Sequence, residues 1–209
     1  MKRFDIITEA DARVLDRGAT VTLARAGHIT PLAADTLRER KITVLHEGRT
    51  SPEDASLAPV AAIRSVAIAS DHGGIALRQG LVTFLRGRGL AVQDLGTDGP
   101  EPVDYPDVAA SVADGVARGQ ADAGIVIDGA GIGSAIAANK VKGIRAAVCH
   151  DTTTARYARQ HNGANVLSLG ATLVTPQEAL EVVDTWMNTP MREARYIRRL
   201  AKIRDLEQA

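Results

Sequence analysis

The sequence predicts an α/β protein: a parallel sheet with helices on both faces, preceded by a small α/β extension. Three observations lead to this prediction. From residue 65 onward, five short apolar runs alternate with segments of helical spacing. Aromatic residues make up only 3% of the chain, so Val, Ile, Leu and Ala must build the core, as in buried parallel strands. A stretch at residues 47–62, EGRTSPEDASLAPVAA, lacks periodicity and separates a shorter N-terminal part from the regular one.

The short N-terminal part shows helix caps and strand alternation. Thr8 can cap a first helix that ends at Gly18, and the run TVTLARA from Thr20 alternates like a strand. Thr30 is the expected cap of a second helix with Pro31 at its first position, and ITVL follows as a short strand.

These boundaries divide the chain of 209 residues into a small module at 1–47, a linker at 48–62 and a main domain at 63–209. A module of this size buries little apolar surface by itself, so we expect it to pack on the main domain or on a partner.

The main domain alternates strictly between strands and helices. Strands are predicted at 65–70, 90–96, 123–128, 144–150 and 164–170, and helices at 74–88, 105–119, from about 133, 152–160, 176–188 and about 191–207. In such sheets ligands bind beyond the carboxyl ends of the strands. This rule selects the segments at 70–74, 128–133, 149–151 and 169–170.

Composition and charge exclude several classes of function. Lys and Arg together number 25, as do Asp and Glu, so neither bulk nucleic-acid binding nor membrane-surface binding is expected. The single cysteine, Cys149, excludes an internal disulfide framework, fits a reducing cytoplasm, and is expected to be a buried inert thiol. No apolar run reaches the ~18 residues of a membrane helix, and the N-terminus turns acidic too soon for a signal peptide. We therefore expect a cytoplasmic protein.

A glycine loop in IVIDGAGIGSAIAANK (125–140) follows the third strand of the main domain. Gly129, Gly131 and Gly133 let the backbone approach a ligand, and the next helix offers free N–H groups to a phosphate or an oxyanion. The alternative is a tight strand-to-helix turn. The spacing differs from the dinucleotide fingerprint, and the P-loop lysine is absent. Asp128 opens the loop, either as a structural cap or as a group that does chemistry.

The motif SDHGG (70–74) ends the first strand of the main domain. Asp71 and His72 there are expected to point into the ligand cleft, although Asp71 could merely cap the next helix. The positions favour a functional interpretation.

Polar residues also gather near the C-terminus. His161 and Asn162 precede the fifth strand, in a functional or a structural role. Arg195, Arg199 and Lys202 share one helix face, which is either solvated or a phosphate clamp built on the two arginines. The histidines lack metal-site spacing, so no metal is expected.

These pieces together resemble the ribose-5-phosphate isomerase B family, which includes the galactose-6-phosphate isomerase subunits. The similarity covers about residues 65–207 and rests on the following marks, in order: SDHGG, DYPD (104–107), GAGIG with AANK, GIRAAV (143–148), RQHN with ANVLSLG, and the pair Arg195 and Arg199. The resemblance implies a Rossmann-like, three-layer domain with a five-stranded parallel sheet. It also implies aldose–ketose isomerisation of a sugar phosphate without metal or cofactor, in a homodimer or dimer of dimers with shared active sites.

The resemblance assigns roles to individual residues. Asp71 would bind sugar hydroxyls or the ring oxygen, and Asn162 would contact the sugar from the partner subunit. The phosphate would be held by His72, Arg195 and Arg199. Tyr105 and Ser134 complete the substrate-binding candidates.

Catalytic roles follow in the same way. His161 would help to open the sugar ring, and the amides of Gly129, Gly131 and Gly133 would stabilise the enediolate, with Asn139 supporting their loop. Asp128 would be the base, in place of the cysteine of many family members.

Two further departures accompany this exchange. Ser134 stands where other members have a glutamate, and Ala130 replaces a hydroxyl residue. A carboxylate at 128 is an effective base if its pKa rises, which desolvation favours and a helix N-terminus opposes.

The expected reaction is ribose 5-phosphate to ribulose 5-phosphate through a cis-enediolate. Alternatives are another pentose or hexose phosphate, a non-catalytic sugar-phosphate-binding protein, and a nucleotide-binding domain.

The N-terminal module resembles a segment carried by enzymes of bacterial microcompartments, through ITEADARVL and HITPLAADTLRER. This resemblance implies packaging or assembly inside a microcompartment, with residues 1–47 contacting the shell or its cargo. The alternative is a stabilising extension that covers part of the dimer.

Overall fold

The computed structural model describes residues 2–46, 52–99, 101–191 and 193–207. It divides the chain into two compact units, Met1–Ala55 and Ser56–Ala209. Of the predicted linker at 48–62, residues 48–51 lie outside the described ranges, residues 52–55 belong to the first unit and residues from 56 onward belong to the second. None of the helices in the described part is long and apolar enough to cross a membrane.

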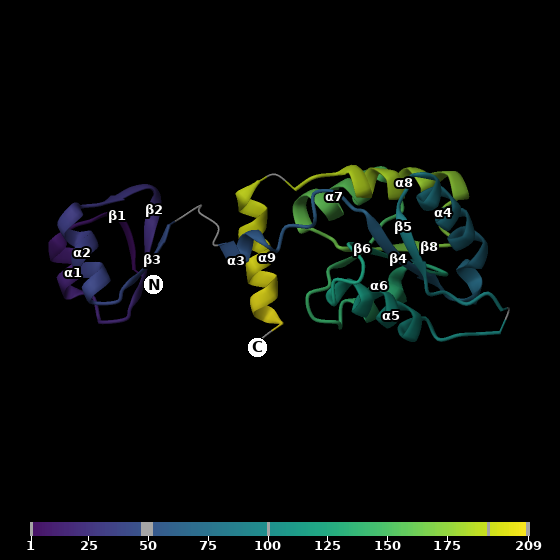
Figure 1. The fold of residues 1–209 in the computed structure, drawn as a ribbon, viewed down its shortest axis with the longest axis horizontal. Coiled ribbons are helices and arrows are strands. Elements are labelled where there is room, and N and C mark those ends of the chain that lie inside the picture. Colours follow the sequence, from purple (N-terminus) through teal and green to yellow (C-terminus); the bar gives the residue numbers. More distant parts are fainter. Residues whose placement is uncertain (1, 47–51, 100, 192, 208–209) are drawn as a thin grey trace. The chain divides into compact units, whose positions relative to one another are not determined.

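The first unit is a small three-stranded parallel sheet with helical crossovers (Figure 1). Its elements are β1 (Arg3–Ile7), α1 (Glu9–Val14), β2 (Thr20–Ile29), α2 (Pro31–Glu39), β3 (Thr43–His46) and α3 (Pro52–Ala55). Strand β1 was not expected from the sequence, because Arg3 and Asp5 interrupt its apolar residues. The signal that could have revealed it is the pair Ile6 and Ile7 directly before the helix cap.

Local capping shapes this unit. Thr8 caps α1 in a capping box with Asp11, whose carboxylate accepts the Thr8 N–H at 2.9 Å. The helix ends at Val14, earlier than expected. Thr30 is the N-cap residue of α2, although its side chain makes no capping bond.

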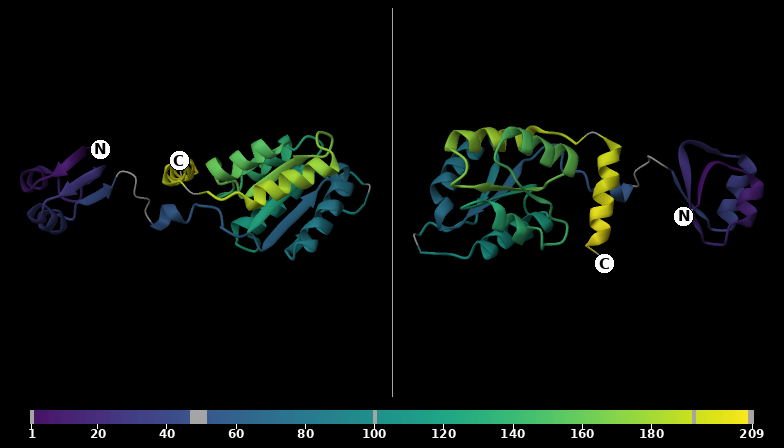
Figure 2. Two further views of the ribbon diagram at one scale, coloured as in Figure 1. Left: turned by 90° about the horizontal axis from the view of Figure 1, so that it is seen from above. Right: turned by 180° about the vertical axis from the view of Figure 1, so that it is seen from behind.

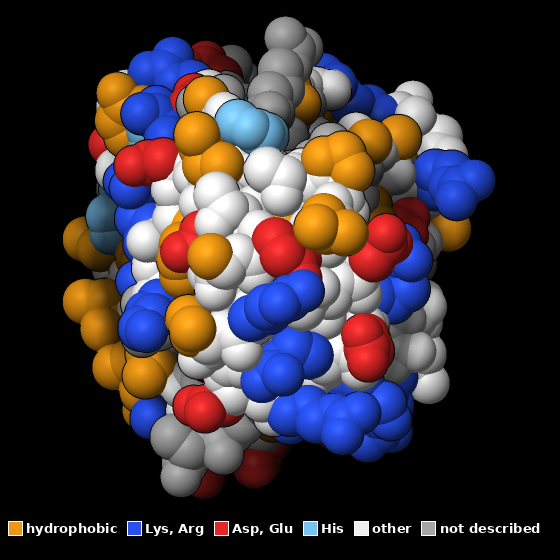
Figure 3. Space-filling model, turned by 90° about the vertical axis from the view of Figure 1, so that its left-hand side faces the viewer, with side chains coloured by type: hydrophobic (Ala, Val, Ile, Leu, Met, Phe, Trp, Pro, Cys, Tyr) orange, Lys and Arg blue, Asp and Glu red, His pale blue; other side chains and the backbone are white. Residues whose placement is uncertain are grey.

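Figure 3 shows acidic, basic and hydrophobic side chains mixed over the face that it presents.

The second unit is the expected parallel α/β domain. Its elements are β4 (Ser65–Ser70), the 3-10 turn η1 (His72–Gly74), α4 (Ile75–Gly87), β5 (Ala91–Asp94), α5 (Tyr105–Ala117), β6 (Ala123–Asp128), α6 (Ile132–Ala138), β7 (Ala146–Val148), α7 (Thr152–Asn162), β8 (Val166–Gly170), α8 (Pro176–Asn188) and α9 (Ala194–Leu206). Five parallel strands lie in the order β5-β4-β6-β8-β7. The predicted fold class is confirmed, although β7 is shorter and α7 two residues longer than expected.

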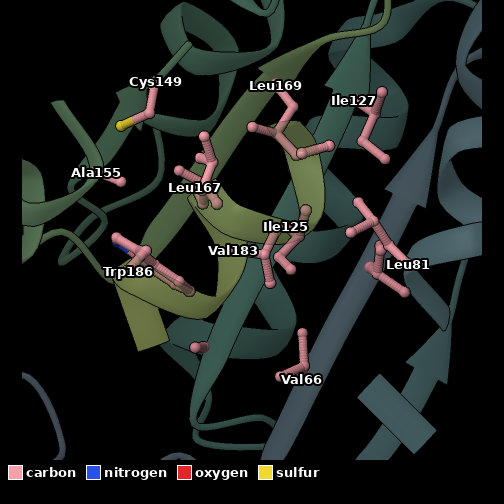
Figure 4. Close-up of a cluster of buried hydrophobic side chains, with 14 of the residues drawn as sticks. Val66, Leu81, Ile125, Ile127, Cys149, Ala155, Leu167, Leu169, Val183 and Trp186 are labelled. Carbon is pink, nitrogen blue, oxygen red and sulfur yellow. The ribbon is translucent and has the colours of Figure 1, made fainter. Parts of the chain in front are cut away.

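Apolar side chains on both faces of the sheet hold the helices in place. Helices α4, α7 and α8 cover one face, and α5 and α6 cover the other (Figure 1). The first face carries the larger side chains, including Leu81, Leu167 and the fully buried Trp186 (Figure 4). Ala, Val and Ile dominate the second face. Strand β6 is buried along its whole length, which explains its continuous apolar run.

Parallel strands give the sheet two distinct edges. The turns after β4, β6 and β8 lie at the carboxyl edge, whereas α6 and α7 each run back to the amino edge. Helix α9 contacts α7 and lies across the domain from the turn that begins α4 (Figures 1 and 2). At about 3.3 Å per residue, the six-residue strand β6 separates the two edges by roughly 16 Å.

Candidate active site

The Asp128 carboxylate caps the glycine loop that follows β6. Its Oδ1 accepts the N–H groups of Ala130, at 2.9 Å, and of Gly131, and its Oδ2 accepts the Ser134 N–H at 2.8 Å. The side chain is 5% exposed. The capping role left open by the sequence is therefore present in the free chain.

These bonds determine the charge of Asp128. Burial raises the pKa of its carboxyl, but hydrogen bonds from the Ser134 hydroxyl and from the loop amides outweigh burial and lower the pKa below its ordinary value. The carboxylate is consequently ionised at neutral pH. The pKa shift is opposite to the one that would strengthen Asp128 as a base.

Some N–H groups of the glycine loop donate to Asp128, and others have no acceptor in the described part of the chain. The Gly131 amide was expected to face the enediolate, and Asp128 engages it instead. Among the described residues, the N–H groups of Gly129, Ile132 and Gly133 have no hydrogen-bond acceptor. These three donors remain available to a ligand.

The end of β8 fixes the loop from the other side. The Ser168 hydroxyl donates to the Gly131 carbonyl at 2.5 Å, and the Thr172 hydroxyl donates to the Gly129 carbonyl at 2.7 Å. Gly131 has a φ of +78°, and a Cβ there would lie 2.9 Å from the Leu169 carbonyl carbon. Sequence reasoning noted SLG at 168–170 as a family mark but missed its anchoring role.

The SDHGG motif forms a second turn at the same edge. Asp71 Oδ1 accepts the N–H groups of Gly73, at 2.9 Å, and Gly74, at 3.1 Å, so this residue also acts as a cap. The exposed His72 accepts the Val103 N–H through Nδ1 at 3.5 Å, which brings the segment before α5 to this turn. Within the described ranges its Nε2 has no hydrogen-bond partner, so it can face a ligand.

Tyr105 joins the glycine loop from the start of α5. A Cβ placed on Gly133 would lie 2.6 Å from the Tyr105 ring, so the ring lies directly over that glycine. Tyr105 is 42% exposed. We call the set of Asp71, His72, Tyr105 and residues 128–134 the carboxyl-edge cluster.

A second group surrounds His161 in the last turn of α7. The His161 ring is stacked between Tyr157 and Tyr196, with centroid distances of 4.7 and 4.6 Å. The guanidinium groups of Arg195 and Arg199 lie 4.8 and 5.7 Å from the Tyr196 ring centre. We call His161, Asn162, Arg195 and Arg199, together with the two tyrosines, the amino-edge cluster.

The arginines of this cluster are exposed cations with few local partners. Arg195 Nε lies 2.6 Å from a Glu193 carboxylate oxygen, and its Nη2 donates to the Tyr196 hydroxyl at 2.9 Å. Sequence reasoning did not single out the tyrosines, although Tyr157 lies four residues before His161 on α7.

Asn139 and Asn162 also lie at the amino edge. They line a cavity of about 370 Å³ with Ile144, Ile203 and Leu206 among its walls. The Asn139 side chain donates to the Ala146 carbonyl at 2.9 Å and accepts the Ala146 N–H at 2.7 Å. Asn139 therefore fixes the α6–β7 turn and does not support the glycine loop as expected.

The predicted site residues thus fall into two separate clusters within one chain. The carboxyl-edge cluster holds the acid, the open amides and His72, and the amino-edge cluster holds His161, Asn162 and the arginine pair. The β6 strand length places roughly 16 Å of sheet between them. A single chain does not bring the two clusters together.

Comparison with known proteins decides the family. The family model for ribose/galactose isomerases matches residues 66–203, about two thirds of the chain. The chain belongs to the ribose/galactose isomerase family. Both clusters lie within the matched residues, whereas the first unit and the segment at 56–63 lie before them.

Two curated relatives in this family carry named activities. Ribose-5-phosphate isomerase B of Escherichia coli is 41% identical over 146 residues, which is 70% of this chain and 98% of the relative. The D-erythrulose-4-phosphate isomerase of Pectobacterium atrosepticum is 43% identical over 126 residues, which is 59% of this chain and 82% of the relative.

A solved structure from the same family agrees in fold. Ribose-5-phosphate isomerase B of Mycoplasma genitalium, with ribulose 5-phosphate bound, superposes with a TM-score of 0.67 and 40% identity, covering 69% of this chain and 96% of that one. The five-stranded domain is therefore the isomerase fold of the family, and the first unit is additional to it.

Proposed function

We propose that this chain is an aldose–ketose isomerase of sugar phosphates, with ribose 5-phosphate as its first candidate substrate and ribulose 5-phosphate as the product. Family membership supports the reaction class. The observation that carries the proposal is the loop at 128–134, where an ionised carboxylate lies beside three N–H groups without acceptors. Isomerisation through a cis-enediolate needs both a base and donors for a developing oxyanion.

In this mechanism Asp128 takes the proton from C2 and returns it to C1. The N–H groups of Gly129, Ile132 and Gly133 receive the negative charge that develops on the sugar oxygens. A substrate oxygen that also takes one of the N–H groups now bound to Asp128 would release that capping bond. The carboxylate then becomes more basic when substrate is in place, because hydrogen bonds to an ionised carboxylate lower its pKa.

The active site is completed by a second copy of the chain. The carboxyl-edge cluster of one copy would meet the amino-edge cluster of the other, so that His161 opens the ring and Arg195, Arg199 and His72 hold the phosphate. Exposed apolar side chains support such an interface: Ile132 of the carboxyl-edge cluster is 55% exposed, and Ile136, one turn further along α6, is 57% exposed.

The test is a panel of aldose phosphates incubated with the protein in heavy water. Ribose 5-phosphate, other pentose and hexose phosphates, and the four-carbon erythrose 4-phosphate are each followed by NMR. We expect ketose with deuterium at C1 from at least one aldose, first from ribose 5-phosphate. A panel without ketose and without deuterium in any returned sugar would contradict the proposal.

A second candidate is a sugar-phosphate-binding protein without turnover. The observation in its favour is the capping of the glycine loop by Asp128, which lowers the pKa of the proposed base. It predicts that panel members raise the melting temperature of the protein while none is isomerised.

For residues 1–47, packaging or assembly in a microcompartment stays a proposal. It is supported by their compact unit with its own apolar core around Ile7, Leu23 and Leu37. In cells that form microcompartments, the fluorescently labelled full chain should collect in them, and a chain lacking residues 2–46 should not. Equal distribution of both would favour a stabilising extension.

A further inference from the structure

Two arginines, the buried Arg159 and the half-buried Arg145, connect the segment before β4 to the loop after α7. Arg159, 1% exposed, donates through Nη1 to the Ala164 carbonyl at 2.8 Å and through Nη2 to the Val60 carbonyl at 3.0 Å. Arg145 donates through Nε to the Gly163 carbonyl at 3.0 Å and through Nη2 to the Leu57 carbonyl at 3.1 Å. Each guanidinium therefore bridges the same two pieces of chain.

Backbone carbonyls accept the hydrogen bonds of both arginines; the charge of Glu207 acts on Arg145, whereas no carboxylate in the described ranges acts on Arg159. Among the residues that the structure describes, neither guanidinium lies within ion-pair distance of a carboxylate. Burial lowers the pKa of Arg159 to about 10, with a further contribution from the charge of Arg145. A buried cation with so little compensation depends on every acceptor that it has. Loss of the carbonyls at 57 and 60 would leave charged N–H groups unsatisfied.

Apolar packing joins the same pieces at Gly163. A Cβ on this residue would lie 2.8 Å from Leu200 of α9, 3.2 Å from Met191 and 3.3 Å from Pro59. Gly163 directly follows His161 and Asn162, and α9 also carries Tyr196, which stacks on His161. The segment at 57–60 thus contacts α7 through Arg159, and Pro59 lies beside Gly163, as does Leu200 of α9.

We propose that residues 57–60 are a positioning segment for the amino-edge cluster. Through Arg145 and Arg159 they hold the loop at 163–164, and through Pro59 they support the packing of α9. These residues lie before the part of the chain that matches the family, so this support is a property of the present chain. The catalytic part of this inference rests on the proposed isomerase function.

The first test uses the full chain with residues 57–60 replaced by four glycines. Glycine retains the carbonyls but removes the packing and adds backbone freedom. The matched control places glycine at Ala61 and Ala62, which are exposed and directly follow the segment. We expect kcat for the active sugar phosphate to fall roughly tenfold in the first variant, with the control within about twofold of the parent, as for surface substitutions.

A double-mutant cycle separates positioning from general loss of stability. If the segment acts through His161, combining the four glycines with His161→Asn should lower kcat no further than His161→Asn alone. Losses that multiply, or equal losses in the glycine variant and the Ala61/Ala62 control, would overturn the inference. Melting temperatures establish that each variant is folded at the assay temperature.

The second test needs no catalysis. The His161 ring protons, assigned by their loss in His161→Asn, should resonate upfield because the ring lies between two tyrosines. With four glycines at 57–60 we expect these resonances to move toward those of an exposed histidine, and the control to retain them. His161 resonances that are unchanged in the four-glycine variant would overturn the inference even if the enzyme is active. A wild-type chain without turnover would contradict the proposed function alone.

Discussion

The Asp128 carboxylate must satisfy the glycine loop and the substrate with the same two oxygens. In the free chain it receives N–H groups from Ala130, Gly131 and Ser134. A carboxylate in this position was predictable from the sequence as a cap or a base. The choice between the roles was not, because it depends on the direction of one side chain and on bonds between residues up to six positions apart.

Asp128→Asn tests the base directly. We expect kcat to fall by roughly 10²- to 10⁴-fold, the usual contribution of a general base. Stability should fall by about 1–3 kcal/mol, because the new amide NH₂ faces a backbone donor. Steady-state kinetics and thermal unfolding measure the two effects.

Asp122→Asn is the matched control for that substitution. Asp122 also accepts two backbone N–H groups, from Arg64 at 2.8 Å and Ser65 at 2.9 Å, but it lies at the amino end of β6. It should lose stability while kcat stays within about threefold, as for a residue without a role in proton transfer. If Asp128→Asn also stays within about threefold, Asp128 is only a cap.

The lowered pKa of Asp128 predicts the pH dependence. The base is active when ionised, so the acid limb of kcat/KM that belongs to Asp128 should lie below the ordinary aspartate pKa of about 3.9. The limb in kcat should lie at higher pH, because bound substrate releases capping bonds. An Asp128 limb of kcat/KM between about pH 5 and 7 would contradict this assignment.

The same shift links Asp128 to stability. Its folded-state pKa is depressed, so its contribution is present above the unfolded value of about 3.9 and is lost as pH falls through the folded value. Wild type should therefore be more stable than Asp128→Asn at neutral pH, and this difference in the free energy of unfolding should disappear in the most acidic range. Urea unfolding from neutral pH downward measures the difference, and a constant deficit would disagree.

The turn from β6 into α6 depends on close packing as well as on its amides. Gly133 lies under the Tyr105 ring, and a Cβ there would approach the ring to 2.6 Å. The sequence predicted both residues as substrate-binding candidates but not their contact, since they belong to different helices. The hydrogen bonds from Ser168 and Thr172 to the loop were not predicted for the same reason: these residues lie at a strand end about 40 residues away in sequence.

Gly133→Ala should displace Tyr105 and disturb the open amide at 133. We expect KM for the active sugar phosphate to rise roughly tenfold if Tyr105 contacts substrate. Gly80→Ala is the control, since a Cβ at this position of α4 meets no atom within 4 Å. That change should stabilise the protein by about 0.5–1 kcal/mol without altering KM. Equal KM values in the two variants would exclude a binding role for this contact.

The arrangement of the whole domain separates the predicted site into two clusters. Strand order and helix direction place residues 128–134 at one edge of the sheet and His161 at the other. Much of this was implicit in the alternating pattern, because a helix that connects parallel strands must return to the amino edge. The position of α9, and hence of Arg195 and Arg199, depends on packing of Tyr196 against His161 and of Leu200 beside Gly163, which no periodicity reveals.

Mixing two inactive variants tests the shared site most directly. Asp128→Asn damages only the carboxyl-edge cluster and His161→Asn only the amino-edge cluster, so each homodimer should have little activity. After subunit exchange at equal concentrations, half of the dimers carry both variants, and each has one intact site. We predict recovery of about one quarter of wild-type activity. Activity that never exceeds the average of the two variants, with subunit exchange verified, would contradict a site built from two copies.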